Sequence, residues 1–398
     1  MKLTKIHRMY ILSFLFTLHI SLSAYVNSTF LTKIISEKYV GLLYTVGAII
    51  TIILLSRSPN LLKYFGNRKL VLWLLFINML SLACLISSGN SSLIALSFIS
   101  ILTTNTLIAL CLDIFIEHFG NPETIGRNRG LYLTITNIAW MLSPLITALL
   151  ITQEGGYISV YIVALATVIL MTLGLFFSVK DFNDKKYERA PFLKTYRYLK
   201  TNKHMLSITI INFILQFFFA WMVVYTPIYL MEHIGFGWDQ IGVIFTIMLA
   251  PFVIFGLPVG ILVDKYHVKK RTLLIIGFLI MAISTLAIPF ISIKSVALWA
   301  LVLFLTRTGA SIVETASEIY FFTHIKEEEA YLLGVFRDMA PVAYIIAPLF
   351  ATLIFVFLPF KYLFIILGII VLCGLYYIPY LKHNHENNEK YSIPNPNQ

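Results

Sequence analysis

The chain has 398 residues, of which 59% are hydrophobic and 12% are charged, and its net charge is +11. Because soluble domains average about 25% charged residues, this composition excludes a soluble globular protein. The basic residues lie in short segments between long apolar runs, which argues against nucleic acid as a partner. The three cysteines lie within apolar runs and lack metal-ligand spacing, so we predict neither a metal site nor a cofactor.

Twelve apolar segments are long enough to cross a bilayer as helices. The first six are 10–31, 39–56, 70–88, 93–115, 131–152 and 157–179. The second six are 205–231, 241–263, 273–291, 296–322, 332–357 and 362–381. The apolar runs are continuous rather than alternating, which favours helices over the strands of a membrane barrel. We therefore predict an all-α fold, a polytopic membrane protein with 12 transmembrane helices.

A basic stretch, 179–204, divides the chain near its midpoint and carries eight lysine and arginine residues. We expect an N-terminal six-helix half (1–178), this stretch as a basic cytoplasmic linker, a C-terminal six-helix half (205–381) and a disordered cytoplasmic tail (382–398). With both termini inside, the cytoplasmic segments hold 25 of the 30 basic residues. This asymmetry predicts a multi-pass protein of the cell (inner) membrane with both termini in the cytoplasm.

The two halves carry related sequences. Shifting the second half back by 204 positions aligns Gly130 with Gly334, Trp140 with Tyr344 and Pro144 with Pro348, and a slip of one more position aligns Asp113 with Glu318. Two six-helix units of the same topology predict parallel pseudo-repeats about an axis along the membrane normal. The two prolines predict kinks or close-packing points in the fifth and eleventh helices.

The loop after the eighth segment reads Gly260-Ile-Leu-Val-Asp264-Lys265-Tyr-His267-Val-Lys269. It is similar to the G-x-L-a-D-r-x-G-r-K loop of the major facilitator superfamily of secondary transporters. Together with the twelve segments and the basic linker, the resemblance covers the whole chain. The phrases around 113–144 and 307–348 also resemble a prokaryotic branch of that superfamily. His267 replaces the second glycine of the pattern, so we expect a different turn there.

The resemblance implies that this loop is a latch between two conformations. Its glycine would let two helices approach closely, and Asp264 would contact a helix N-terminus or an arginine. The related loop after the second segment keeps Gly66 but has Lys63 in place of the aspartate, so we expect no carboxylate clasp there. Charged residues near the predicted inner helix ends are further candidates, with a static ion-pair network as the alternative. The latch candidates are Gly260, Asp264, Lys265, Asp113, Glu318 and Arg337.

Helix 296–322 carries charges where lipid would be expected. Arg307 lies near its middle, Glu314 and Glu318 follow after 7 and 11 positions, and Ser311 falls on the same face. Charges within a span are costly and indicate function. Arg307 is always charged and is a candidate anion binder, whereas Glu314 is the candidate for carrying a proton. About 10.5 Å of helix separates the two, so we expect no direct contact. A static ion-pair network that packs helices is the alternative.

By resemblance, helices 1, 4, 7 and 10 would line a central cavity. This nominates four more residues, of which His19 has a hydrogen-bonded packing role as its alternative. The substrate and coupling candidates are Arg307, Glu314, His19, Asn105, Gln216 and Trp221.

We predict a secondary active transporter of a small solute that works by alternating access, is coupled to protons and exports an amphipathic compound. An uptake permease for a sugar or other metabolite is the first alternative, and a non-transporting membrane sensor or enzyme is the second. An enzyme would need His, Asp or Ser clustered at one membrane face, and the sequence offers none; it also lacks a nucleotide-binding loop. We therefore predict that the chain is not an enzyme. Its expected partners are a small-molecule substrate, a coupling ion and the lipid bilayer, with the protein a monomer.

Overall fold

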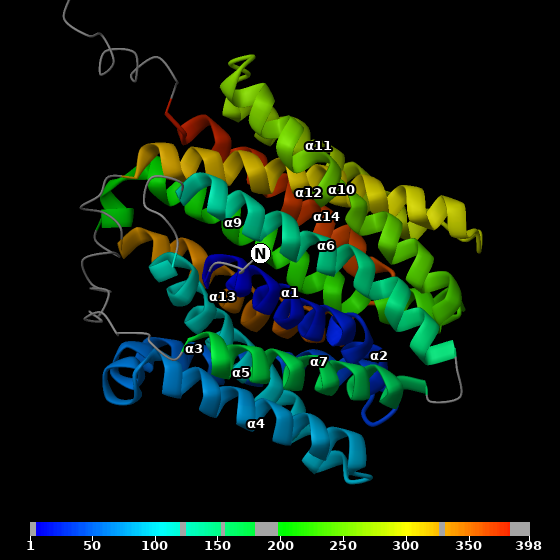
Figure 1. Cartoon of the computed structure of the whole chain (residues 1–398). Helices are drawn as coiled ribbons and strands as arrows, with labels where there is room; N and C mark the ends of the chain where they lie inside the picture. Colours follow the sequence, from blue (N-terminus) through cyan, green and yellow to red (C-terminus); the bar gives the residue numbers. More distant parts are fainter. Residues whose placement is uncertain (1–4, 120–124, 153–155, 180–197, 326–330, 383–398) are drawn as a thin grey trace, which may run out of the picture.

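The computed structural model of the chain describes residues 5–119, 125–152, 156–179, 198–325 and 331–382. Helices account for most of these residues, and no strand occurs among them (Figure 1). Twelve helices are long and apolar enough to cross a membrane, and each corresponds to one predicted segment. The all-α fold with twelve spans is therefore confirmed. Most of the predicted linker 179–204 and of the predicted disordered tail 382–398 lies outside the described residues.

The N-terminal half contains the first six spans. They are α1 (Lys5–Ala24) with α2 (Val26–Thr32), α3 (Glu37–Phe65), α4 (Asn67–Ser87), α5 (Ser91–Phe119), α6 (Ile125–Thr152) and α7 (Gly156–Ser178). The C-terminal half contains the other six. They are α9 (Lys203–Ile228) with the π-helical turn η2 (Tyr229–His233), α10 (Trp238–Asp264), α11 (Lys270–Ala287) with η3 (Ile288–Phe290), α12 (Val296–His324), α13 (Tyr331–Ile354) and α14 (Tyr362–Tyr377) with η5 (Ile378–Tyr380).

Several helices are longer than their apolar segments. The clearest case is α3, which continues past the predicted end at position 56 through Arg57, Pro59 and Lys63 to Phe65. An apolar pattern detects only the part of a helix that lies in lipid, so a charged continuation goes unnoticed. The first span differs in another way, because it is interrupted at Tyr25 between α1 and α2.

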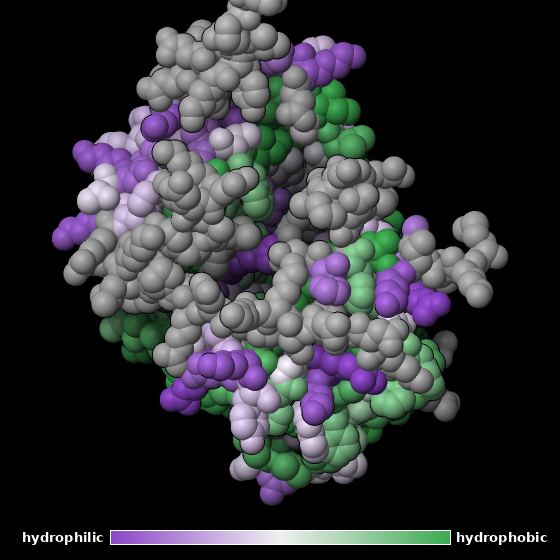
Figure 2. All heavy atoms as spheres, turned by 60° about the vertical axis from the view of Figure 1, so that its left-hand side comes forward, coloured by the Kyte–Doolittle hydropathy of each residue, from purple (hydrophilic) through white to green (hydrophobic). Residues whose placement is uncertain are grey.

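Twelve crossings return the chain to the side on which it began, so both ends of the described chain lie at one face, on the left in Figure 1. We call this the terminal face and the opposite one the far face. Figure 2 turns the terminal face toward the viewer: hydrophilic side chains gather on it, and some lie inside a recess near its centre. The prediction that this face is cytoplasmic remains a prediction.

Packing within the two halves follows the same scheme. In the N-terminal half, α5 packs against α3 and α4, while α1 packs against α6 and α7. In the C-terminal half, α12 packs against α10 and α11, while α9 packs against α13 and α14. These contacts join equivalent helices of the two repeats, as a fold of two parallel six-helix pseudo-repeats requires. The predicted internal repeat is therefore present in the structure.

The halves meet along two equivalent helix pairs, α3 with α13 and α6 with α10. A glycine faces a proline carbonyl group in each pair. A Cβ atom added at Gly41 would lie 2.9 Å from the carbonyl oxygen of Pro348, and one added at Gly242 would lie 2.8 Å from that of Pro144. Both distances are shorter than van der Waals contact, so only glycine fits. The two prolines are thus close-packing points, the second of the two roles predicted for them.

The turn after α10 differs from its counterpart after α3, as the replacement of the glycine predicted. Gly66 is the single residue between α3 and α4 and has a φ of 73° and a ψ of 154°. Residues 265–269 connect α10 to α11, and His267 in the middle of this connection has a φ of 51°. A positive φ is therefore kept in both turns although the glycine is not.

Candidate functional site

A cavity of about 230 Å³ lies between the two halves. Its walls come from the break between α1 and α2 and from helices α6, α9, α10, α12 and α13. The lining residues are Tyr25, Asn137, Trp140, Gln216, Phe219, Val223, Leu249, Phe252, Arg307, Glu314 and Tyr344. Three of the six predicted substrate and coupling residues, Arg307, Glu314 and Gln216, therefore line one cavity.

Arg307 is buried in the middle of α12, with 2% of its surface exposed. The centre of its guanidinium group lies 5.1 Å from the ring centroid of Phe218 and 5.3 Å from that of Phe219. These ring faces stabilise the positive charge where water is excluded. Its Nε has no hydrogen-bond partner within the described part of the chain, and no described carboxylate lies within 4.0 Å of the guanidinium group.

Glu314 lies two turns further along α12, is half-buried and lines the same cavity. The seven residues between the two positions correspond to about 10.5 Å along the axis, which agrees with the absence of an ion pair between them. Between them, Ser311 donates a hydrogen bond of 3.3 Å to the carbonyl oxygen of Pro251 in α10. The polar face of α12 thus contacts both the cavity and protein.

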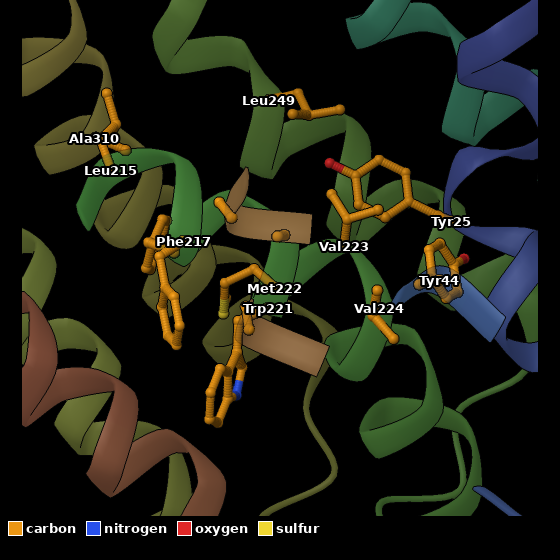
Figure 3. Close-up of a cluster of buried hydrophobic side chains, with 14 of the residues drawn as sticks. Tyr25, Tyr44, Leu215, Phe217, Trp221, Met222, Val223, Val224, Leu249 and Ala310 are labelled. Atoms are coloured by element: carbon orange, nitrogen blue, oxygen red, sulfur yellow. The ribbon is translucent and has the colours of Figure 1, made fainter. Parts of the chain in front are cut away.

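Aromatic rings form much of the remaining wall. The Tyr25 ring lies 4.8 Å from that of Phe245 in the other half and 6.3 Å from that of Trp140, measured between centroids. Figure 3 shows Tyr25 on the same side of α9 as Val223 and Leu249. Tyr344 and Phe252 complete the ring-bearing walls. The site therefore combines one arginine and one carboxyl group with flat apolar surfaces.

Trp221 does not line the cavity, contrary to its grouping with Gln216. Gln216, Phe219 and Val223 share one face of α9, since they are three and four residues apart, and Trp221 falls away from that face. It is fully buried and packs against Phe217, with 5.2 Å between ring centroids. In Figure 3 its ring points away from Tyr25.

His19 and Asn105 lie inside the N-terminal half and outside the lining of the cavity. The Nδ1 atom of His19 is 3.1 Å from the carbonyl oxygen of Ala164, and its Nε2 atom is 3.3 Å from Oδ1 of Asn105. Asn78 donates hydrogen bonds to the same Oδ1 atom, at 2.9 Å, and to Thr104 Oγ1, at 2.8 Å. This network joins α1, α4, α5 and α7, as expected for the packing role that was the alternative for His19.

Two latch candidates form an ion pair across the halves. The Nη1 atom of Arg337, near the start of α13, donates to Oδ2 of Asp113, near the end of α5, at 2.9 Å. Both positions lie toward the terminal face, and about a third of each side chain is exposed. Glu318 is half-buried one turn beyond Glu314 on α12. The sequence predicts only that these charged residues lie near inner helix ends, and the structure shows that Asp113 and Arg337 form an ion pair.

The glycine latch is not seen in this conformation. No atom of another described element lies within 4 Å of a Cβ atom built at Gly260, so no described helix approaches it closely, and the neighbouring Leu257 is 76% exposed. This turn of α10 faces outward, which is the physical reason that the predicted close approach is absent. Lys265 caps α10 and is exposed, while the side chain of Asp264 lies outside the described residues.

Contacts at the far face close the gap between the halves there, and sequence reasoning missed them. Nε1 of Trp238 donates a hydrogen bond of 3.0 Å to the hydroxyl group of Tyr157. Nε2 of His233 lies 3.2 Å from Oε2 of Glu37. Tyr157 and Trp238 are among the first residues of their spans, a position where aromatic residues are common at a membrane surface, so a signal was available but unspecific.

A second cavity, of about 210 Å³, is the pseudo-symmetric counterpart of the first. It is lined by Tyr44, Ala48, Thr51, Leu102, Thr106, Ala340, Pro341 and Tyr344. A shift of 201 positions, which also relates the loops after α3 and α10, places Ala48 on Leu249 and Thr51 on Phe252. The shift of 204 places Pro341 on Asn137 and Tyr344 on Trp140, and the shift of 205 places Leu102 on Arg307. Tyr344 borders both cavities. Equivalent positions therefore line both cavities, but among the described lining residues only those of the first cavity include charged side chains.

Comparison with known proteins agrees with this architecture. The family model described as Major Facilitator Superfamily matches residues 9–240 and 224–394. No curated protein sequence matches the chain at a significant level.

Three solved structures share the fold at low sequence identity. A bacterial homologue of the human lysosomal transporter Spinster, in an inward-facing and unoccupied conformation, has a TM-score of 0.71 at 13% identity, covering 95% of this chain and 94% of its own. A bacterial metal transporter has a TM-score of 0.67 at 14% identity, covering 95% and 98%. The human organic anion transporter MFSD10 (TETRAN) has a TM-score of 0.66 at 13% identity, covering 94% and 98%.

Proposed function

Since this chain belongs to the Major Facilitator Superfamily, we propose that it is a secondary active transporter that moves a small solute across a membrane by alternating access. The observation that carries the proposal is the cavity between the two halves, which holds a buried arginine and a carboxyl group at mid-span. Ionisable residues at that depth are costly unless they bind a substrate, an ion or each other.

Proton coupling is the second element of the proposal, and Glu314 is its candidate carrier. It lines the cavity, and the protein offers it no ion pair with Arg307. A carboxyl group can gain and lose a proton, whereas the arginine stays charged. Loading and release of a proton at Glu314 would then accompany loading and release of the solute, because both occupy the same space.

Alternating access requires contacts that break at one face while others form at the opposite face. The Asp113–Arg337 ion pair is the candidate at the terminal face, and Trp238–Tyr157 with His233–Glu37 are the candidates at the far face. Each joins the two halves, so a rocking motion of the halves must separate it. We propose that the protein works as a monomer in the cell membrane, with the terminal face in the cytoplasm.

The test is transport by purified protein in liposomes on a solid-supported membrane. Concentration jumps with pools of metabolites and amphipathic compounds should give transient currents or, for an electroneutral cycle, a change in a trapped pH-sensitive dye. Arg307→Gln should abolish the response, while Arg57→Gln, at an exposed position of α3, should not. A protein that binds solutes but produces neither signal with any pool would overturn the proposal.

A further inference from the structure

The first cavity holds a positive charge that no described protein group neutralises directly. Arg307 contacts two ring faces and hydrogen-bonds with Tyr25, its Nε has no partner among the described groups, and Tyr25 and Tyr344 are uncharged phenols. A guanidinium group offers five N–H donors in a planar fork that matches a carboxylate or sulfonate. An anionic ligand would supply the negative charge that these neighbours lack, together with acceptors for the remaining N–H groups.

The number of charges limits the ligand. Among the described residues, Arg307 and Glu314 are the charged ones that line the first cavity, and no described residue that lines the second cavity is charged. With Glu314 protonated the combined site carries a single positive charge, which suits a monoanion. A dianion would leave one negative charge buried and unpaired, a costly arrangement inside a membrane.

The size and walls of the two cavities describe the rest of the ligand. The first cavity, of about 230 Å³, is smaller than the range of about 300–1,000 Å³ that is typical for drug-sized ligands. Its aromatic walls suit a flat apolar group beside the anion. Tyr344 forms a wall common to both cavities and stacks on Tyr44 with 6.3 Å between ring centroids, so a rotation of these rings would join the two spaces.

We propose that the two cavities form one bipartite site for an amphipathic organic monoanion, whose charged group binds Arg307 and whose apolar part passes Tyr344 into the uncharged cavity. The proposal rests on the transport function inferred above and names its substrate class. The pseudo-symmetry assigns each part of the ligand to one cavity. The charged group, or head, binds in the first cavity beside Arg307, and the apolar part, or tail, binds in the second cavity, where Leu102 occupies the equivalent position.

Glu314 then determines when the anion binds. Its neighbours on α12 are Arg307 and Glu318, and Tyr25 and Tyr344 face the cavity from other elements. The helices packed against α12 add no titratable side chain at this depth: none occurs between His204 and Tyr225, between Asp239 and Asp264, or in α11 after Arg271. An ionised Glu314 would repel the anion, so anion and proton bind together by linkage.

The first experiment tests the charge of the ligand. Full-length protein in nanodiscs is titrated with 4-phenylbutyrate, its sulfonate analogue, the neutral 4-phenylbutyramide and the cation 4-phenylbutylamine, with thermal stability and calorimetry as readouts. We expect the two anions to bind and the amide and amine not to. Arg307→Gln should weaken anion binding by about 10- to 100-fold, the usual effect of losing a charged hydrogen bond. Arg57→Gln should match the wild type.

If Arg307→Gln fails to fold, two other measurements decide. Arg307→Lys keeps the charge without the fork and should bind the anion more weakly than the wild type. In wild-type protein, anion affinity should fall as the pH rises, because Glu314 loses its proton and repels the ligand, and Glu314→Gln should bind independently of pH. Affinity that rises with pH, or a pH response that survives in Glu314→Gln, would overturn the linkage.

The second experiment tests the bipartite geometry with benzoate, phenylacetate, 3-phenylpropionate and 4-phenylbutyrate. Affinity should rise by up to about fourfold per methylene group as the apolar part reaches the second cavity. Ala48→Leu fills that cavity and should remove the gain for the longer acids while leaving benzoate unchanged. Ala83→Leu, at an exposed position of α4, is the control. If Ala48→Leu lowers the affinity for all four acids equally, or for none of them, the assignment of the apolar tail to the second cavity is wrong.

Failure of this inference differs from failure of the proposed function. If neutral or cationic analogues bind and no carboxylate or sulfonate does, the substrate class is wrong, while transport currents with other solutes would still support the transporter. If anions bind as described but no pool produces a current or a proton movement, the bipartite site stands and the transport proposal fails.

Discussion

Replacing Gly242 by alanine should destabilise the protein, although alanine is the better helix former. The new Cβ atom would lie 2.3 Å from Cβ of Ala148 and 2.8 Å from the carbonyl oxygen of Pro144, and ordinary contact begins at 3.4 Å. Helices α6 and α10 must therefore separate by roughly 1 Å, and overpacking of this kind costs about 1–3 kcal/mol. Alanine returns about 1 kcal/mol through helix propensity, so we expect a net loss of up to about 2 kcal/mol.

The same helix supplies the matched controls. Within the described part of the chain, nothing outside their own helix lies within 4 Å of a Cβ atom built at Gly256 or Gly260, so alanine there adds helix propensity without a clash and should stabilise the protein slightly. Thermal unfolding of the three variants in one detergent measures the difference. The reasoning fails if Gly242→Ala is as stable as Gly256→Ala. Gly41→Ala should repeat the loss, because its Cβ atom would meet the carbonyl group of Pro348.

Three further predictions concern the two charged pairs and the orientation in the membrane. Replacing Arg307 and Glu314 together by glutamine should preserve folding but abolish pH-dependent solute binding; uptake with the wild-type pH response in the double variant would leave these residues only a packing role. Asp113→Asn should weaken closure at the terminal face, and exchanging the charges of Asp113 and Arg337 should restore it; a double-mutant cycle should give a coupling of about 0.2–1 kcal/mol because the pair is partly exposed. A cysteine at Asn90 should react with an impermeant maleimide in intact cells, whereas one in the linker 179–204 should not; the reverse pattern would invert the orientation.

The number and places of the spans could be predicted because lipid leaves no alternative to a helix over a long apolar segment. The repeat could be predicted for a related reason, since the positions that shape helix contacts, such as Pro144 and Pro348, carry the same residue in both halves. What the sequence did not provide is the direction in which a side chain points around a helix that is apolar on all sides. Trp221 and Gln216 are five residues apart, and only the packing of α9 shows that they face different neighbours.

The repeat also held information about the cavity that the sequence reasoning did not use. Trp140 and Tyr344 are equivalent positions, and both line the first cavity. The shift of 205 positions that pairs Asp113 with Glu318 also pairs Leu102 with Arg307. This pairing could have predicted that the position equivalent to the buried arginine is apolar in the N-terminal half. Tyr25 gave no such signal, because the break between α1 and α2 has no proline or glycine to mark it.

The unequal distribution of charge between equivalent cavities has a consequence for the proposed transport cycle. Arg307 and Glu314 lie on one helix of the C-terminal half, whereas Tyr25, Asn137 and Trp140 belong to the N-terminal half. When the halves rock about the equivalent helix pairs α3–α13 and α6–α10, the anion and its proton stay with α12, and the aromatic wall moves relative to them. Affinity for the anionic group would then depend on the C-terminal half, whereas the N-terminal half supplies access and most of the wall around the apolar tail. Substitutions at Trp140 should therefore change the transport rate more than the affinity for benzoate, which lacks such a tail.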